Sequence, residues 1–80
     1  MNFYELLPVQ EQNQKSFYGK AIVQCYDKEK ILFSYGTKIA SIKGNKIKKY
    51  WSGWSKTTGK HIFAFCGLKK ADFQKLKLEV

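Results

Sequence analysis

Residues 16–26 read SFYGKAIVQCY, and this stretch decides the fold. Every second position from Phe17 to Cys25 carries a small or apolar side chain, and the positions between them carry larger, mostly polar ones. An alternation with a period of two is typical of a β-strand that buries one face. Because the buried set consists mostly of small residues, we expect this strand to pack closely against a helix.

The chain after this strand predicts a meander of three antiparallel strands. A charged turn over 27–30 leads to a second strand over 31–42, in which we expect a bulge or bend at Gly36. A tight turn over 43–46 contains glycine and asparagine, which tolerate the positive φ angles of such turns. A third strand over 47–51 follows, and the short connections predict antiparallel pairing.

A helix is predicted after the third strand. Ser55 or Thr57 can cap its first turn through a hydroxyl group, and Gly67 suits the position that ends it. Its apolar stripe consists of Thr58, Ile62, Phe65 and Cys66. Gly59 weakens the first turn, so we expect a short helix whose stability depends on contact with the sheet.

The last residues are predicted to return to the sheet. Residues 76–80 alternate between apolar and charged side chains, which indicates a strand at an edge. The alternation in the third strand is ambiguous, and we expect Ile47 and Trp51 to face the core with Lys49 near an edge. The predicted fold is therefore α+β in the order β-β-β-α-β, a small antiparallel sheet with one helix on one face and a C-terminal edge strand.

Length and composition limit the classes of protein that remain. A chain of 80 residues has room for one domain, which we assign to residues 16–80 after an N-terminal arm or short capping segment over 1–15. The composition is 44% hydrophobic and 26% charged, which argues against both a disordered tail and a membrane span. No segment has the length of a spanning helix or the pattern of a signal peptide, so we expect a soluble cytoplasmic protein.

The charge of the chain predicts an anionic partner. Fifteen basic residues against six acidic ones give a net charge of +9, and all fifteen are lysines. Lysine lacks the planar fork with which arginine recognises guanine, so contacts with nucleic acid should involve phosphates and carry little sequence specificity. Two alternatives remain: a solvated surface that keeps the protein soluble, and a surface that meets an acidic protein.

Lysines alternate with aromatic residues in the first and third predicted strands. Lys49, which we expect near an edge, is a further candidate contact with nucleic acid. The alternating positions are Tyr18, Lys20 and Tyr26 in the first strand, and Lys46, Lys48 and Tyr50 in the third. Such side chains can share the sheet face opposite the helix, where aromatic rings stack on bases of DNA or RNA. Lys56, Lys60 and Trp54 form a second candidate patch at the helix start. Alternatively, the tyrosines fill a thin core, or a second copy of the chain covers this face in a homodimer.

The residues that carry catalysis or bind metals form no recognisable pattern. Asp27 and Glu29 are close in sequence but lie in a predicted turn, and we expect no enzymatic activity and no cofactor. Cys25, Cys66 and His61 lack the spacing of a metal site, and we expect the cysteines to be buried thiols. His61 is either a polar contact at a surface, a general base, or an anchor of the helix start to the turn over 52–55; we favour the anchor.

A larger pattern resembles a family. It consists of Ser34-Tyr35-Gly36-Thr37, Ile39-Ala40, Lys46, Trp51-Ser52-Gly53-Trp54-Ser55, Thr57-Thr58, His61-Ile62 and Phe65. It is similar to short uncharacterised domains encoded by phages and by Firmicute genomes that carry mobile elements. Lys60 stands where that family often has arginine, and Cys66-Gly67 departs from its usual apolar continuation. The resemblance implies an accessory protein in a bacterial cytoplasm and does not imply an activity.

Two functions fit these observations. The first is a non-enzymatic protein of phage type that binds DNA or RNA with little sequence specificity. The second is a phage-encoded inhibitor that contacts a bacterial protein, such as a CRISPR effector or another host enzyme, in the manner of an anti-CRISPR protein.

Overall fold

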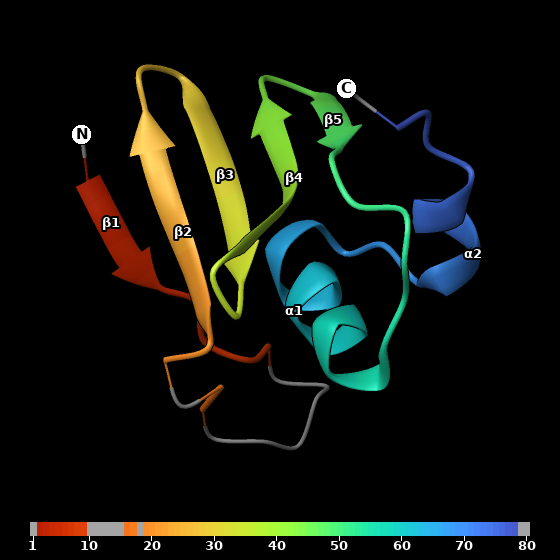
Figure 1. The fold of residues 1–80 in the computed structure, drawn as a ribbon. Coiled ribbons are helices and arrows are strands. Elements are labelled where there is room, and N and C mark those ends of the chain that lie inside the picture. The colour runs from red at the N-terminus through yellow and green to blue at the C-terminus, as the bar shows by residue number, and fades with distance from the viewer. Residues whose placement is uncertain (1, 10–15, 18, 79–80) are drawn as a thin grey trace.

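The computed structural model describes residues 2–9, 16–17 and 19–78. They form an α+β fold in which a five-stranded antiparallel sheet carries its helices on one side (Figure 1). The elements are β1 (Asn2–Glu5), β2 (Ala21–Tyr26), β3 (Glu29–Ser34), β4 (Thr37–Lys43), β5 (Lys46–Lys49), α1 (Lys56–Cys66) and α2 (Lys70–Gln74). The strands lie side by side in chain order, and two-residue turns join β2 to β3, β3 to β4 and β4 to β5. The predicted α+β class is confirmed, but the three-stranded sheet is not.

The predicted second strand is two strands. Tyr35 and Gly36 have φ angles of 52° and 80°, and together they form a two-residue turn between β3 and β4. Positive φ at both positions is the requirement of the tightest hairpin turns. The chain therefore reverses at Gly36, where we had expected a bulge or a bend. The bulge lies opposite Leu32 and Phe33 instead, because Ile39 is an extra residue in β4.

Both ends of the chain also differ from the prediction. The segment predicted as an arm or cap contains β1, which pairs with β2 through contacts such as Tyr4 with Val23. The predicted C-terminal strand is absent from the described residues, where α2 is followed by one parallel bridge between Lys49 and Leu78. Burial of Phe73 explains the helix, because one turn of α2 brings this ring into the core at 0% exposure.

The core lies between α1 and one face of the sheet. Val23, Leu32 and Ala40 are partners across β2, β3 and β4, and all three are fully buried. Ile62 of α1 packs in the same core cluster, and it belongs to the apolar stripe predicted for this helix. The predicted cap residues are confirmed: Thr58 N donates to Ser55 Oγ at 3.0 Å, and Gly67 ends the helix with a φ of 75°.

His61 fastens α1 to the sheet. Its Nδ1 atom lies 2.8 Å from Ser34 Oγ on β3, and its ring meets that of Phe17 edge-on at 4.5 Å between centroids. The anchoring role agrees with the prediction, but the partner is a strand residue where we had expected the turn before the helix. Burial lowers the pKa of His61, because desolvation disfavours the charged imidazole.

Cys25 and Cys66 are half-buried free thiols, and burial raises the pKa of Cys66.

Among the described residues, no helix is long and apolar enough to cross a membrane.

Candidate nucleic-acid interface

The two faces of the sheet differ in their covering. The described helices pack on the face that holds Val23 and Leu32, and we call the opposite surface the open face. The open face comprises Phe3, Glu5, Ile22, Gln24, Tyr26, Glu29, Ile31, Phe33, Lys38, Ser41, Lys43, Lys46 and Lys48, with Tyr50 continuing the line of β5. Cross-strand partners share a face, so the register alone places these side chains together.

Strands β1, β2 and β3 give the open face an apolar half. Phe3 is 62% exposed on the edge strand, and Ile22, Ile31 and Phe33 are half-buried beside it. At one end of this half the surface is hollowed into a depression of about 500 Å³. The depression is lined by Phe3, Gly19, Lys20, Ile22, Phe33, Tyr35 and Gly36. An exposed aromatic surface of this kind can accept a planar apolar group.

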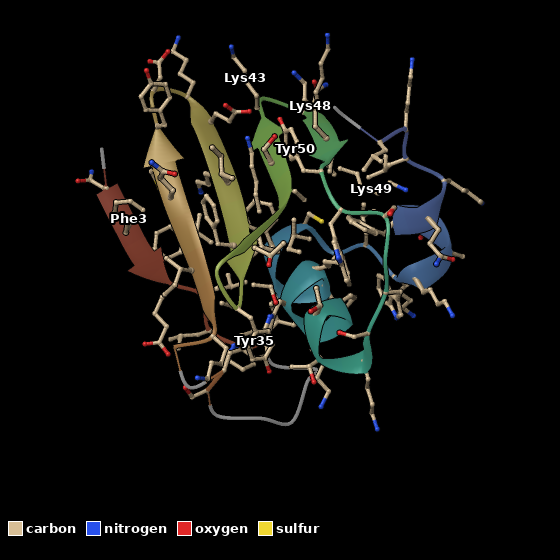
Figure 2. All side chains as sticks on the ribbon, in the orientation of Figure 1. Phe3, Tyr35, Lys43, Lys48, Lys49 and Tyr50 are labelled. Carbon is tan, nitrogen blue, oxygen red and sulfur yellow. The ribbon has the colours of Figure 1, made fainter. Side chains whose placement is uncertain are left out.

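Strands β4 and β5 give the open face a basic half. Its residues Lys38, Lys43, Lys46 and Lys48 are all exposed. Figure 2 shows Lys43 and Lys48 at the end of the sheet where β4 and β5 are joined. A depression of about 640 Å³ at this end is lined by Lys28, Lys43, Gly44, Asn45, Lys46 and Lys48. The arrangement concentrates positive charge and can neutralise phosphate groups.

One pair in the basic half is unfavourable by itself. Lys43 and Lys46 are direct cross-strand partners in the β4–β5 hairpin, and like charges in that position destabilise a sheet. An anion bound between the two ammonium groups would relieve their repulsion. On its other side Lys43 faces Glu29 of β3, so the protein itself offsets part of this repulsion, and the remaining positive charge is open to an anion.

Tyr50 holds one lysine of the basic half in place. The Nζ atom of Lys38 lies 4.0 Å from the centre of the Tyr50 ring, and the Tyr50 hydroxyl accepts a hydrogen bond from Ser41 Oγ at 3.3 Å. Tyr50 thus lies on the open face, as predicted. Because Lys38 covers its ring, Tyr50 is better placed to position a cation than to stack on a base.

The other predicted interface residues fall into three groups. Lys20, Tyr26, Lys46 and Lys48 are exposed on or beside the open face. Tyr18 lies outside the described residues. Lys49 is only 7% exposed on the helix-facing side, because its cross-strand partner is the buried Ala40. Its Nζ donates to the carbonyl oxygen of Gln74 at 3.4 Å, and Figure 2 shows the side chain directed toward α2. This correction removes Lys49 from the interface.

The second predicted patch belongs to the helix layer. Lys56 and Lys60 are exposed on α1, and Trp54 is half-buried beside them, with its ring 5.9 Å from that of Phe73. The patch surrounds a depression of about 410 Å³, lined by Trp54, Lys56, Gly59, Lys60, Phe63, Leu68, Lys69 and Lys70. Since α1 covers the opposite side of the sheet, this patch and the open face present separate surfaces.

Sequence reasoning missed several residues of the open face, and those that matter for binding are Phe3, Phe33, Lys38 and Lys43. Phe3 was missed because its segment was assigned to an arm. Lys38 and Lys43 were missed because β3 and β4 were read as one strand, which hides their register against Phe33 and Lys46. A turn signal at Tyr35-Gly36 would have separated the two strands.

The part of the chain that the structure describes holds no cluster of metal-ligating side chains. There, no three side chains of His, Cys, Asp or Glu come together as a metal ion requires. His61 is 1% exposed, so its imidazole does not reach the surface.

The fold and the open face together define a small α+β protein with a sheet surface divided into an apolar and a basic half. Residues 4–79 match the family of unknown function DUF8033, and the chain belongs to that family. Neither the comparison with curated proteins nor the comparison with solved structures gave a match. This match confirms that the chain is an uncharacterised domain of unknown function, as the resemblance implied.

Proposed function

We propose that the protein binds nucleic acid through the open face of its sheet, with little sequence specificity and without catalysing a reaction. The basic half carries the proposal, because exposed lysines from β4 and β5 converge there and Lys43 faces Lys46 directly. The net charge of +9 supports it by drawing polyanions to the surface. Lysine offers no bidentate contact to base edges, so the binding relies on phosphates.

The resemblance to phage and mobile-element domains suggests where such a protein would act. We propose a bacterial cytoplasm, where the ligand is DNA or RNA of the host or of the element. A rival function is inhibition of a bacterial protein such as a CRISPR effector. Exposed apolar residues favour that rival, since Phe3 and Leu7 are 62% and 59% exposed near one edge of the sheet.

An electrophoretic mobility shift series tests the proposal. Labelled single- and double-stranded DNA and RNA are titrated with micromolar protein at about 50 and about 200 mM salt. We expect a shift that weakens steeply with salt, and a triple variant with Lys43, Lys46 and Lys48 each replaced by Glu should lose it. Absence of a shift at the lower salt concentration would overturn the proposal.

A matched variant separates the two lysine surfaces. Lys56→Glu with Lys60→Glu changes charge on the helix layer, and we expect it to retain binding apart from a general electrostatic loss. If the helix variant abolishes binding and the sheet variant does not, the site lies on α1. Capture of one stoichiometric protein from nuclease-treated bacterial lysate, combined with no shift, would favour the inhibitor.

A further inference from the structure

Resting on the proposed function, we infer that the ligand is an unpaired strand of nucleic acid, which runs its phosphates along β4 and β5 and lays its bases over β1, β2 and β3. The observation behind this inference is the segregation of the open face. Lysines occupy one half and apolar side chains the other, and a single strand is the form of nucleic acid that presents both a charged edge and free base faces.

The charges on the open face are divided between its halves. The four lysines of the face belong to β4 and β5, whereas its carboxylates, Glu5 and Glu29, belong to β1 and β3. Glu29 faces Lys43 at the boundary between the halves, and Lys20 lines the depression of the apolar half. Glu5 accepts a hydrogen bond from the Gly19 backbone amide at 3.1 Å, which holds this carboxylate at the margin of the apolar half. The basic half keeps an excess of positive charge, whereas the charges of Glu5 and Lys20 offset each other at the margin of the apolar half, so phosphates are drawn to β4 and β5 and the backbone of a strand has one preferred path.

The spacing along β5 suits successive phosphates. Alternate residues of a strand lie about 6.6 Å apart on the same face. Lys46 and Lys48 are related in this way, and Lys43 stands beside Lys46 across the hairpin. These ammonium groups can therefore meet different phosphates of an extended chain.

The apolar half suits bases that are free to stack. Phe3 is exposed at the edge, Phe33 lies in the middle of the sheet, and both line the same depression. A duplex keeps its base faces inside its own stack and presents phosphates outside, so this half would gain nothing from it. Unpaired bases stack on aromatic side chains without regard to sequence, which agrees with the low specificity proposed above.

Fluorescence anisotropy tests this inference with four labelled probes of equal length at one salt concentration: single-stranded DNA, single-stranded RNA, duplex DNA and an abasic DNA strand. We expect both single strands to bind at least about tenfold more tightly than the duplex and the abasic strand, because only they offer bases for stacking. The two single-stranded arms show whether DNA or RNA is preferred.

Neighbouring residues of β1 provide a matched pair of variants. Phe3 faces the open side, whereas Tyr4 pairs with the buried Val23 on the helix side and is also partly exposed, at 42%. Phe3→Ala should weaken binding of the single strands about fivefold to tenfold and leave the abasic strand unchanged, and Tyr4→Ala should change neither. Phe33→Ala should have an effect at least as large, with circular dichroism used to confirm its folding.

The outcomes separate this inference from the proposed function. Equal affinities for single strand, duplex and abasic strand, with Phe3→Ala and Phe33→Ala both silent, would overturn the single-strand inference while leaving nucleic-acid binding intact. Failure of all four probes to bind would overturn both.

Discussion

The Nδ1 atom of His61 lies 2.8 Å from the Oγ atom of Ser34, and this hydrogen bond joins α1 to β3 inside the core. Thr58 Oγ1 lies 3.2 Å from the same hydroxyl, so three polar groups satisfy one another where water is excluded. A buried group without a partner would cost about 1–3 kcal/mol. The contact therefore fixes the position of the helix on the sheet, and burial of the ring, not the hydrogen bond itself, disfavours a charged imidazole there.

Acid should destabilise the protein through His61. Burial lowers the pKa of this residue in the folded state below its ordinary value of 6.5, so the unfolded chain binds more protons between those two values. The free energy of unfolding is therefore full above pH 6.5 and declines as the pH falls toward the folded-state pKa. Chemical denaturation from about pH 7.5 to about pH 5 measures this loss.

A variant isolates the contribution of His61 from that of the carboxylates. His61→Gln keeps a polar side chain but cannot titrate, so its stability should be lower at neutral pH and should decline less over the same range. Equal declines in the variant and the natural protein would show that His61 does not control the acid response.

Gly59 is required by the ring of Trp54 and not by the backbone of α1. A Cβ atom at Gly59 would lie 2.4 Å from Trp54 Cζ2 and 2.9 Å from Cε2. Alanine is favoured over glycine inside a helix by about 1 kcal/mol, but overpacking costs about 1–3 kcal/mol. We expect Gly59→Ala to lower the free energy of unfolding, as measured by chemical denaturation.

Removing the ring should reverse the sign of this effect. In a Trp54→Ala background, Gly59→Ala should raise the free energy of unfolding by about 0.5–1 kcal/mol, because helix propensity then acts alone. A destabilising Gly59→Ala in both backgrounds would mean that close packing against Trp54 is not the reason for the glycine.

We expect Lys49 to contribute to the stability of the fold and not to contact nucleic acid. Its amine contacts the Gln74 carbonyl oxygen and lies 5.5 Å from the centre of the Phe73 ring. Lys49→Met keeps the stem and removes a buried charge, so we expect stability within about 1 kcal/mol of the natural protein. Lys49→Glu should cost at least about 2 kcal/mol, because a buried carboxylate would face a carbonyl oxygen.

The neighbouring residue serves as the control for binding. Lys48 projects from the open face, so Lys48→Met should weaken nucleic-acid binding. It should also reduce the slope of log affinity against log salt concentration by about one, because one phosphate contact is lost. Lys49→Met should change neither the affinity nor this slope. Anisotropy at several salt concentrations measures both effects. A larger loss of affinity from Lys49→Met than from Lys48→Met would contradict the assigned faces.

Local signals in the sequence predicted the elements that have clear local causes. The alternation over 16–26 predicted β2 and its buried face, and the hydroxyl of Ser55 and the left-handed conformation of Gly67 set the ends of α1. These features depend on neighbouring residues along the chain. The basic character of the surface was also visible, since it follows from composition alone.

Features that depend on distant partners were not predictable in this way. Residues 2–5 form a strand because β2 offers an edge, and residues 70–74 form a helix because Phe73 fills a space beside Trp54. Lys49 looked like an interface residue because periodicity gives two faces but does not say which one the core covers. The register with Ala40 settles that question, and it is set by the two-residue turn at Gly44 and Asn45 and by the extra residue Ile39 in β4.

Tyr35 should trade stability against binding. Its φ angle of 52° is left-handed, a conformation that costs most residues about 1–2 kcal/mol and that asparagine adopts more readily. Its ring is 58% exposed and lines the depression in the apolar half, so little burial is lost on replacement. The ring of Tyr35 also lies 5.8 Å from that of His61, and loss of this contact offsets part of the gain. Tyr35→Asn should therefore raise the free energy of unfolding by up to about 1 kcal/mol. It should also weaken binding of a single strand severalfold, because one aromatic ring is lost from the depression. Denaturation and anisotropy on one preparation decide the matter: a variant with lower stability and unchanged affinity would show that Tyr35 supports the fold and not the interface.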